Sequence, residues 1–188
     1  MRTIFSCLFF VLLFISSSGQ DLHFYKENIT MKIDHGYFYV TGIYYLKSER
    51  NESEILFYPY PVDSIFGAVD SIYFYNMTTN QILNPLKTDV RGTIFNIDFG
   101  HYNDQAIQIS YRQKLRSTRA EYILKSTIGW KESIVQADYQ LIVPSAMRIC
   151  HFSIPPRDSI TTAHEIVYLW KKNNYMPSEN LIFDFIMK

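Results

Sequence analysis

Apolar and polar residues alternate with a period of two along much of this chain. Residues 29–33, 95–99 and 107–111 carry an apolar side chain at every second position, and residues 135–143 extend the pattern. Successive side chains of a β-strand point to opposite faces, so each segment predicts a strand with one buried and one wetter face. The alternation therefore predicts an all-β fold.

Other segments are apolar at nearly every position. They cover residues 37–46, 55–60 and 71–75, and they predict central strands or strands with tyrosines on the outer face. The sequence contains 15 tyrosines and 14 phenylalanines. Aromatic side chains suit a pleated, half-buried surface, so this composition favours the same fold class.

Turn signals separate these segments at intervals of roughly ten residues, which is typical of a β-sandwich or barrel. His35-Gly36 predicts a tight turn, and residues 48–53 predict a polar hairpin loop. Pro144 and Pro155-Pro156 cannot donate to a sheet ladder, so they mark strand ends. We expect an antiparallel β-sandwich.

Residues 159–170 are compatible with two structures. Apolar residues at 163, 166, 167 and 170 have helical spacing and follow serine and threonine residues that can cap a helix. Residues 166–170 are equally a run of β-formers. We predict a strand, because it would pair with residues 181–185 across the loop between them.

Residues 1–19 have the order of a secretory signal peptide. Arg2 is their only charge, the run Ile4–Ile15 is almost wholly apolar, and small residues follow it. A membrane-spanning helix needs ~20 apolar residues, so this shorter run favours a cleaved leader over a retained anchor. We therefore predict a single domain over residues 20–188 that is secreted, periplasmic or at the cell surface.

Charge argues against nucleic acid as a partner. Without Arg2, the mature chain has 17 lysines and arginines against 18 aspartates and glutamates. The difference is a net charge of about −1. The mature chain therefore has no basic excess to bind a phosphate backbone, and its charge gives no attraction to an anionic membrane surface. No stretch after the leader approaches spanning length, so we expect no membrane span in the mature chain.

The mature chain has one cysteine, Cys150, so an internal disulfide is excluded and the fold must rely on burial. Cys150 lies in the apolar run 148–154, which predicts a buried, inert thiol. His151 adjoins it, but neighbours on a strand point to opposite faces. We therefore expect no nucleophile–base pair here.

The sequence carries no recognisable catalytic, cofactor or metal motif. The five histidines are His23, His35, His101, His151 and His164. No two have the spacing of a helical zinc site, and no Cys-x-x-Cys, Gly-x-Ser-x-Gly, Walker loop or dinucleotide fingerprint occurs. We predict no catalytic, cofactor-binding or metal-binding residues and no cofactor.

Carboxylates offer one alternative. Asp63 and Asp70 bracket the apolar stretch 65–69. Glycoside hydrolysis requires two opposed carboxyl groups, and a sequence cannot show opposition. An extracytoplasmic glycan-active hydrolase is therefore an alternative function.

Three segments match the N-glycosylation sequon, at Asn28, Asn51 and Asn76. Each could carry a glycan in a eukaryotic secretory pathway. In a bacterium the same matches would have no meaning.

The tyrosines allow two interpretations. They cover sheet edges, with a rigid ring packed and a hydroxyl in water. Alternatively they form a flat platform for sugar rings or a partner protein, since tyrosine offers contact area at low entropic cost. The residues of that partner surface are Tyr58, Tyr60, Tyr73 and Tyr75.

Three stretches together resemble a known class of domain. The first contains Val40–Leu46, a polar loop and Leu56-Phe-Tyr-Pro-Tyr-Pro-Val62. The second consists of residues 122–130 followed by 137–144, and the third covers residues 170–183. They resemble secreted β-sandwich domains of unknown function, and more distantly vault and inter-α-trypsin-type domains. The resemblance implies an immunoglobulin-like sandwich and carries over no catalytic or ligand residue.

Pro59 and Pro61 remove two backbone donors from the Tyr-Pro-Tyr-Pro stretch. They predict a sheet edge at which no further strand can pair continuously.

The whole sequence predicts a secreted, non-catalytic binding or structural module whose partner is a protein or a surface glycan. Two alternatives are open. The mature length also allows a small outer-membrane β-barrel, and the carboxylates allow the glycan-active hydrolase.

Overall fold

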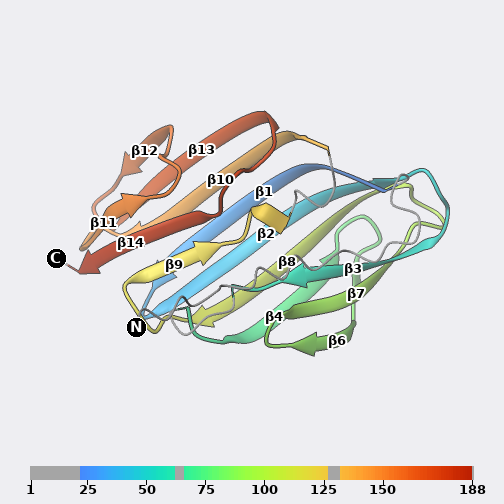
Figure 1. Ribbon diagram of the computed structural model, residues 1–188, viewed down its shortest axis with the longest axis horizontal. Helices are drawn as coiled ribbons and strands as arrows, with labels where there is room; N and C mark the ends of the chain where they lie inside the picture. The colour runs from blue at the N-terminus through green and yellow to red at the C-terminus, as the bar shows by residue number, and fades with distance from the viewer. Residues whose placement is uncertain (1–21, 62–65, 127–131, 188) are drawn as a thin grey trace, which may run out of the picture.

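The computed structural model describes residues 22–61, 66–126 and 132–187, and most of them lie in β-strands (Figure 1). The strands are β1 (Leu22–Asp34), β2 (Tyr37–Ser48), β3 (Ser53–Pro59), β4 (Val69–Asn76), β5 (Gln81–Ile82), β6 (Pro85–Asp89), β7 (Gly92–Asp98), β8 (Asp104–Lys114), β9 (Arg119–Tyr122), β10 (Ile134–Pro144), β11 (Met147–Phe152), β12 (Asp158–Thr161), β13 (Glu165–Tyr175) and β14 (Leu181–Met187). The all-β prediction is confirmed.

The signal peptide predicted over residues 1–19 lies outside the described residues. Within them, no helix has the length and hydropathy needed to cross a membrane.

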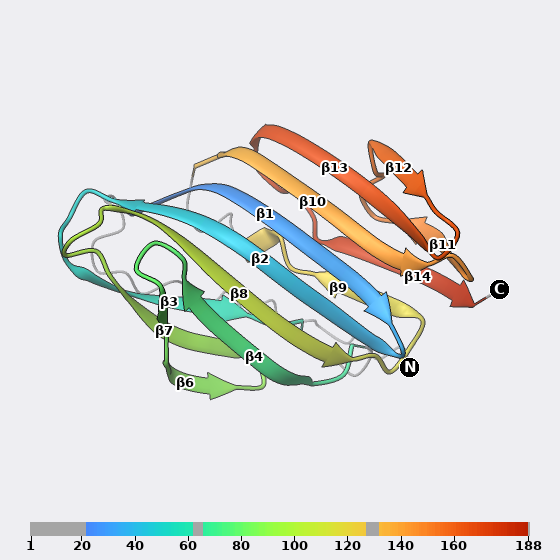
Figure 2. The same ribbon diagram turned by 180° about the vertical axis from the view of Figure 1, so that it is seen from behind.

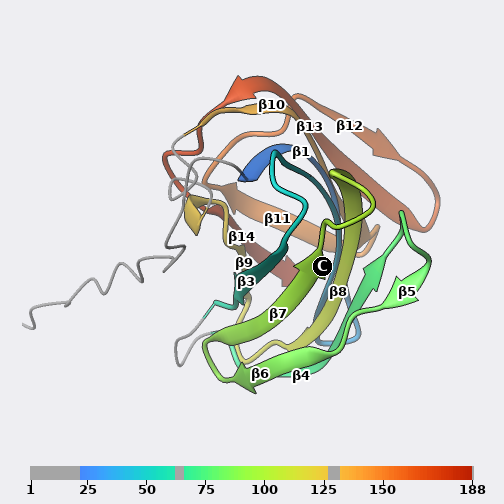
Figure 3. The same cartoon turned by 90° about the vertical axis from the view of Figure 1, so that its right-hand side faces the viewer.

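The strands form one large sheet and two small ones. The large sheet has eight strands in the order β12-β13-β10-β1-β2-β8-β4-β5, and the small sheets have the orders β11-β14-β9 and β3-β7-β6. The large sheet curves around the small sheets, which cover its inner face (Figures 1 and 3). Figure 2 shows the opposite, outer face of the large sheet, with the small sheets behind it.

The core lies between the large sheet and both small sheets. Phe38 of β2 packs against Phe183 of β14 with ring centroids 6.4 Å apart, and Phe74 of β4 packs against Phe95 of β7 at 4.6 Å. The predicted alternation places the following side chains in this core: Ile29, Met31, Ile33, Ile107 and Ile109. Each small sheet therefore packs against part of the large sheet's inner face.

One strand pair is parallel. Residues 26–32 of β1 run in the same direction as residues 136–142 of β10, while the other pairs among the described strands are antiparallel. The expectation of a wholly antiparallel sandwich is therefore wrong. β1 and β10 are distant in sequence, so a long connection, which parallel pairing requires, is available. An immunoglobulin domain has seven to nine strands in two antiparallel sheets, so the observed topology also differs from the one that the resemblance implies.

The tight turn at His35-Gly36 is confirmed. Asp34 pairs with Tyr37, and the two residues between them have φ angles of 47° and 77°. Positive φ at both central positions matches the right-handed twist of the flanking strands, and glycine adopts it without steric strain.

Two predicted pairings are wrong because other strands occupy the edges concerned. Residues 48–53 contain the predicted polar loop, but β2 pairs with β1 and β8, so the chain crosses to β3 in a small sheet. The segment 166–170 is a strand, as predicted, within β13. Its neighbours are β10 and β12, whereas residues 181–185 belong to β14 and pair with β11 and β9.

The thiol of Cys150 is exposed, so the expectation of a buried cysteine is wrong. Ile149 pairs with Phe185 and His151 pairs with Asp184, which leaves Cys150 in a β-bulge. A bulge interrupts the alternation of faces. Cys150 and His151 are therefore both exposed instead of facing opposite sides of the sheet.

Candidate functional site

The two small sheets leave a seam beneath the large sheet. Their edge strands β3 and β9 belong to different sheets (Figure 3). Tyr58 of β3 and Tyr122 of β9 nevertheless both reach the hydroxyl of Tyr44. Pro59 ends β3 beside this gap, as the sequence predicted for a sheet edge. Pro59 has no backbone N–H to donate, so β3 cannot continue a ladder toward β9 at that position. We call the gap between β3 and β9 the seam.

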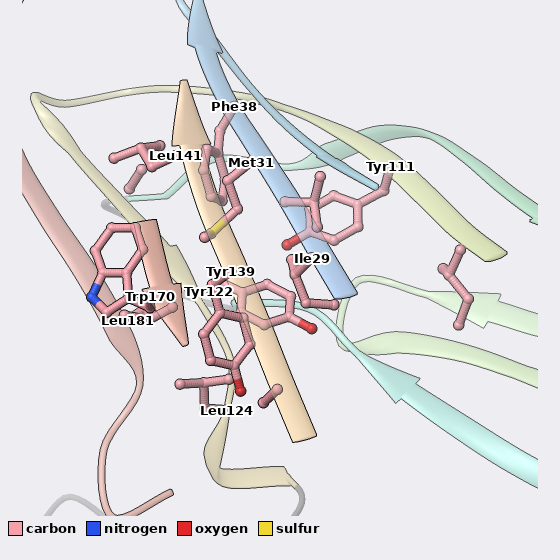
Figure 4. Packing of buried hydrophobic residues seen from close by; sticks show 14 of the residues in the cluster. Ile29, Met31, Phe38, Tyr111, Tyr122, Leu124, Tyr139, Leu141, Trp170 and Leu181 are labelled. Carbon is pink, nitrogen blue, oxygen red and sulfur yellow. The ribbon is translucent and has the colours of Figure 1, made fainter. Parts of the chain in front are cut away.

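Five polar side chains meet at the seam. The hydroxyl of Tyr44 lies 2.9 Å from that of Tyr58 and 2.8 Å from that of Tyr122. The hydroxyl of Tyr139 donates to Glu27 Oε1, and Glu27 is only 1% exposed. We call these five residues the tyrosine–glutamate cluster. Figure 4 shows two of them, Tyr122 and Tyr139, among the buried apolar side chains of the core.

Strand register places Glu27 and Tyr44 side by side on the inner face. The β1–β2 ladder pairs them directly, and Glu27 is in phase with the buried alternation of residues 29–33. A β-bulge between Phe24 and Lys26 then shifts the phase, so that Phe24 is buried as well. Sequence reasoning missed Glu27, although a charged residue in phase with the apolar face of a strand was the available signal.

Gly42 makes room for the ring of Tyr44. A Cβ atom at position 42 would lie 2.5 Å from the Tyr44 hydroxyl oxygen and 2.6 Å from two ring carbons. Heavy atoms do not approach that closely, so a side chain at position 42 would push the ring away from Tyr58 and Tyr122. The absence of a side chain at Gly42 therefore allows Tyr44 to contact Tyr58 and Tyr122.

Burial changes the ionisation of the cluster. Desolvation raises the pKa of Glu27 from 4.5 to about 7, and the hydrogen bond from Tyr139 partly opposes this rise. Burial also raises the pKa of the hydroxyls of Tyr44, Tyr58 and Tyr122 well above 10. Glu27 is therefore the member of the cluster whose charge changes near neutral pH.

A small cavity adjoins the cluster. Its volume is about 30 Å³, and its walls include Glu27, Tyr44, Tyr58, Tyr111 and Tyr122. Tyr44 and Tyr58, which line the cavity, are half-buried, whereas Glu27 and Tyr122 are buried.

A larger groove lies on the outer face of the large sheet. Its volume is about 470 Å³, and β1, β10, β13 and the start of β12 form it. Its polar lining residues are Asn28, Thr30, Asp138, Gln140, Arg157, Asp158 and Lys171. We call it the outer groove. It offers amide, carboxylate and cationic groups together, so it presents both hydrogen-bond donors and acceptors.

Hydrogen bonds orient several of these side chains. Gln140 Nε2 donates to Thr30 Oγ1 at 2.6 Å, and Gln136 Nε2 donates to Asp138 Oδ2 at 2.5 Å. Asn28 Nδ2 lies 3.4 Å from the Tyr45 hydroxyl. The groove is therefore partly organised before any ligand arrives.

The four tyrosines of the predicted partner surface do not lie together in the structure. Tyr60 is 4% exposed and its hydroxyl bonds to Thr93, while Tyr58 belongs to the tyrosine–glutamate cluster. Neither lies on a flat outer platform, which corrects that part of the prediction. Tyr73 and Tyr75 of β4 do stack on the outer side, with ring centroids 6.1 Å apart, and Tyr73 is 42% exposed.

The three sequons have different environments. Asn51 is exposed in the loop between β2 and β3, whereas Asn28 is half-buried on β1. Asn76 is 3% exposed; its Nδ2 donates to Gln105 and its Oδ1 accepts from the backbone of Thr78. A glycan on Asn76 has no room in the folded chain, which corrects that assignment.

The other titratable candidates do not converge on a catalytic site. Asp70 forms an exposed, bidentate ion pair with Arg112, and Asp63 lies outside the described residues. His151 lies 3.4 Å from Asp184, which also pairs with Arg119. Within residues 22–61, 66–126 and 132–187, no group of three His, Cys, Asp or Glu side chains could hold a metal ion.

Comparison with known proteins gives a likeness in fold. No protein-family model matches this chain, and no curated protein matches its sequence. The fold is similar to the crystal structure of a putative nutrient binding protein from Legionella pneumophila, with a TM-score of 0.69 and 13% identity over 89% of this chain and 68% of that one. It is also similar to an M1 zinc metallopeptidase from Deinococcus radiodurans, with a TM-score of 0.50 and 8% identity over 87% of this chain and 42% of that one. At these identities the likeness shows the fold alone.

The close approach at Gly42 predicts that Gly42→Ala destabilises the protein by roughly 1–3 kcal/mol, as overpacking of a core does. Denaturant unfolding measures the change. In a Tyr44→Ala background the ring is absent, so Gly42→Ala should have little effect there. Equal losses in both backgrounds would contradict the role of Gly42.

The raised pKa of Glu27 predicts a pH-dependent stability. Between pH 4.5 and about 7 the folded chain holds the Glu27 proton more tightly than the unfolded chain does, so the free energy of unfolding falls as the pH rises through this window. The total fall from this group is at most roughly 3 kcal/mol. Denaturant unfolding at several pH values measures it. Glu27→Gln should remove this part of the slope, and the exposed loop variant Glu52→Gln should retain it; equal slopes in both variants would refute the assignment.

Proposed function

We propose that this protein is a non-catalytic binding module that holds a polar ligand, of the kind presented by the sugar residues of a surface glycan, in the outer groove. The outer groove carries this proposal. A volume of about 470 Å³ falls within the range of small-molecule sites in proteins. Its amide, carboxylate and cationic side chains can pair with neighbouring hydroxyl groups as donors and as acceptors.

Pre-organisation supports the same conclusion. Gln140 and Asp138 are already held by hydrogen bonds from or to their strand neighbours. A ligand would therefore meet groups that need little further ordering, which lowers the entropic cost of binding. The similar Legionella fold is named for nutrient binding, which agrees with a binding role for this architecture.

The place of action is part of the proposal. The sequence begins with the pattern of a secretory leader, so we place the mature domain outside the cytoplasm, in the periplasm or at a cell surface. A surface glycan is a ligand that such a domain would meet there.

A protein partner is the second candidate. Tyr73 and Tyr75 stack on the outer side of β4, and exposed tyrosines are enriched at protein interfaces. A shallow pair of rings lacks the concavity of the outer groove, which is why we rank the groove first.

Binding to a panel of soluble oligosaccharides, measured by calorimetry, tests the proposal. We expect Asp138→Ala and Gln140→Ala each to weaken binding about tenfold, equivalent to about 1.4 kcal/mol, because each removes a directed hydrogen bond. Lys87→Ala on β6, in a different sheet, serves as the control and should bind normally.

Other outcomes discriminate between the alternatives. Oligosaccharide binding that is insensitive to both groove variants but lost in Tyr73→Ala would place the ligand on the Tyr73–Tyr75 pair instead of in the outer groove. Cleavage of an oligosaccharide during incubation would favour the hydrolase. Absence of binding across the panel would reject the glycan proposal.

A further inference from the structure

Among the residues that the structure describes, the carboxyl group of Glu27 has no ionic partner. It is 1% exposed, and its hydrogen bond comes from the neutral hydroxyl of Tyr139. In the part of the chain that the structure describes, no lysine, arginine or histidine acts on its pKa. A buried carboxylate without a counter-charge is unfavourable, so a bound cation would stabilise the ionised form of Glu27.

The cavity beside Glu27 has walls that suit a cation. Tyr44, Tyr58, Tyr111 and Tyr122 line it together with the Glu27 side chain. The face of a tyrosine ring attracts a positive charge, and a tyrosine hydroxyl oxygen accepts hydrogen bonds from N–H donors. The cavity thus combines one negative group with several aromatic rings.

The cavity admits only a small group. A single water needs about 10–15 Å³ of such space, so about 30 Å³ holds roughly two heavy atoms. A –CH₂–NH₃⁺ terminus has this size. A quaternary ammonium has five heavy atoms and would not enter.

We propose that the seam cavity binds one primary ammonium group, with Glu27 as its counter-ion and the surrounding tyrosines as the rest of its shell. The remainder of the ligand would extend from the cavity past the half-buried side chains of Tyr44 and Tyr58. This site lies on the inner face of the large sheet, so it is separate from the outer groove and does not depend on the function proposed there.

Proton and ammonium would compete for Glu27. The ionisable groups around it are the tyrosines Tyr139 of β10, Tyr44 of β2, Tyr58 of β3, Tyr111 of β8, Tyr122 of β9 and Tyr175 of β13. Burial raises the pKa of all six hydroxyls, so they remain neutral while Glu27 titrates. Binding should therefore strengthen as the pH rises through the pKa of Glu27 and should level off above it.

Methylammonium is the probe for this site. We expect it to raise the Tm of the full chain at pH 8, and calorimetry should show at least tenfold tighter binding at pH 8 than at pH 5.5. Tetramethylammonium and potassium at the same concentration serve as controls for size and ionic strength, and neither should reproduce the effect. Equal effects of all three cations, or no methylammonium binding at pH 8, would overturn the proposal.

Variants separate the site from general effects on the fold. Glu27→Gln should reduce methylammonium affinity at pH 8 at least tenfold, and Glu52→Gln should leave it unchanged. Tyr139→Phe removes the bond that lowers the pKa of Glu27 but keeps the carboxyl group, so binding should persist with its pH midpoint moved upward. If Glu27→Gln fails to fold, the Tyr139→Phe midpoint decides: an unmoved midpoint would refute the role of Glu27.

Discussion

The pairing of β1 on both of its edges is the constraint on which the rest of the structure depends. β2 pairs with it antiparallel and β10 pairs with it parallel, so β1 joins strands that are distant in sequence into one curved sheet. Because successive side chains of β1 point to opposite faces, this strand contributes a residue to the inner cavity and another to the outer groove. Glu27 points into the tyrosine–glutamate cluster, and its neighbour Asn28 lines the outer groove. One strand thus connects an interior cavity to an exterior surface.

Two separate small sheets cover the inner face of the large sheet. The gap between them explains where buried polar side chains occur. A continuous covering sheet would bury that face with apolar side chains throughout. Between β3 and β9 the cover is interrupted, and tyrosines take the place of phenylalanines there, since their rings pack while their hydroxyls bond to one another. Glu27 lies beside the same interruption and is buried there. The cavity beside Glu27 therefore lies where the two small sheets are not joined.

Several features followed from local patterns. The His35-Gly36 hairpin was predictable because both residues that need positive φ are adjacent in sequence. The edge at Pro59 was predictable because a missing N–H is a property of the residue itself. The hairpin expected at residues 48–53 failed for a different reason: a polar loop does not reveal whether the following strand pairs with the preceding one or crosses to another sheet. Composition groups Tyr58 with Tyr73, but the fold places Tyr58 in the tyrosine–glutamate cluster and leaves Tyr73 exposed.

The amino-acid sequence by itself determined the all-β class, the main strands and the face on which most side chains lie, because alternation depends only on neighbouring residues. It even placed Glu27 in phase with the buried residues of β1. Only the tertiary structure decided that β10 pairs with β1, that β13 and β14 lie in different sheets, and that a seam opens beside Glu27. Those outcomes depend on contacts between distant residues, and closing a long loop costs little more than closing a shorter one. Local sequence therefore cannot select the partner of a strand.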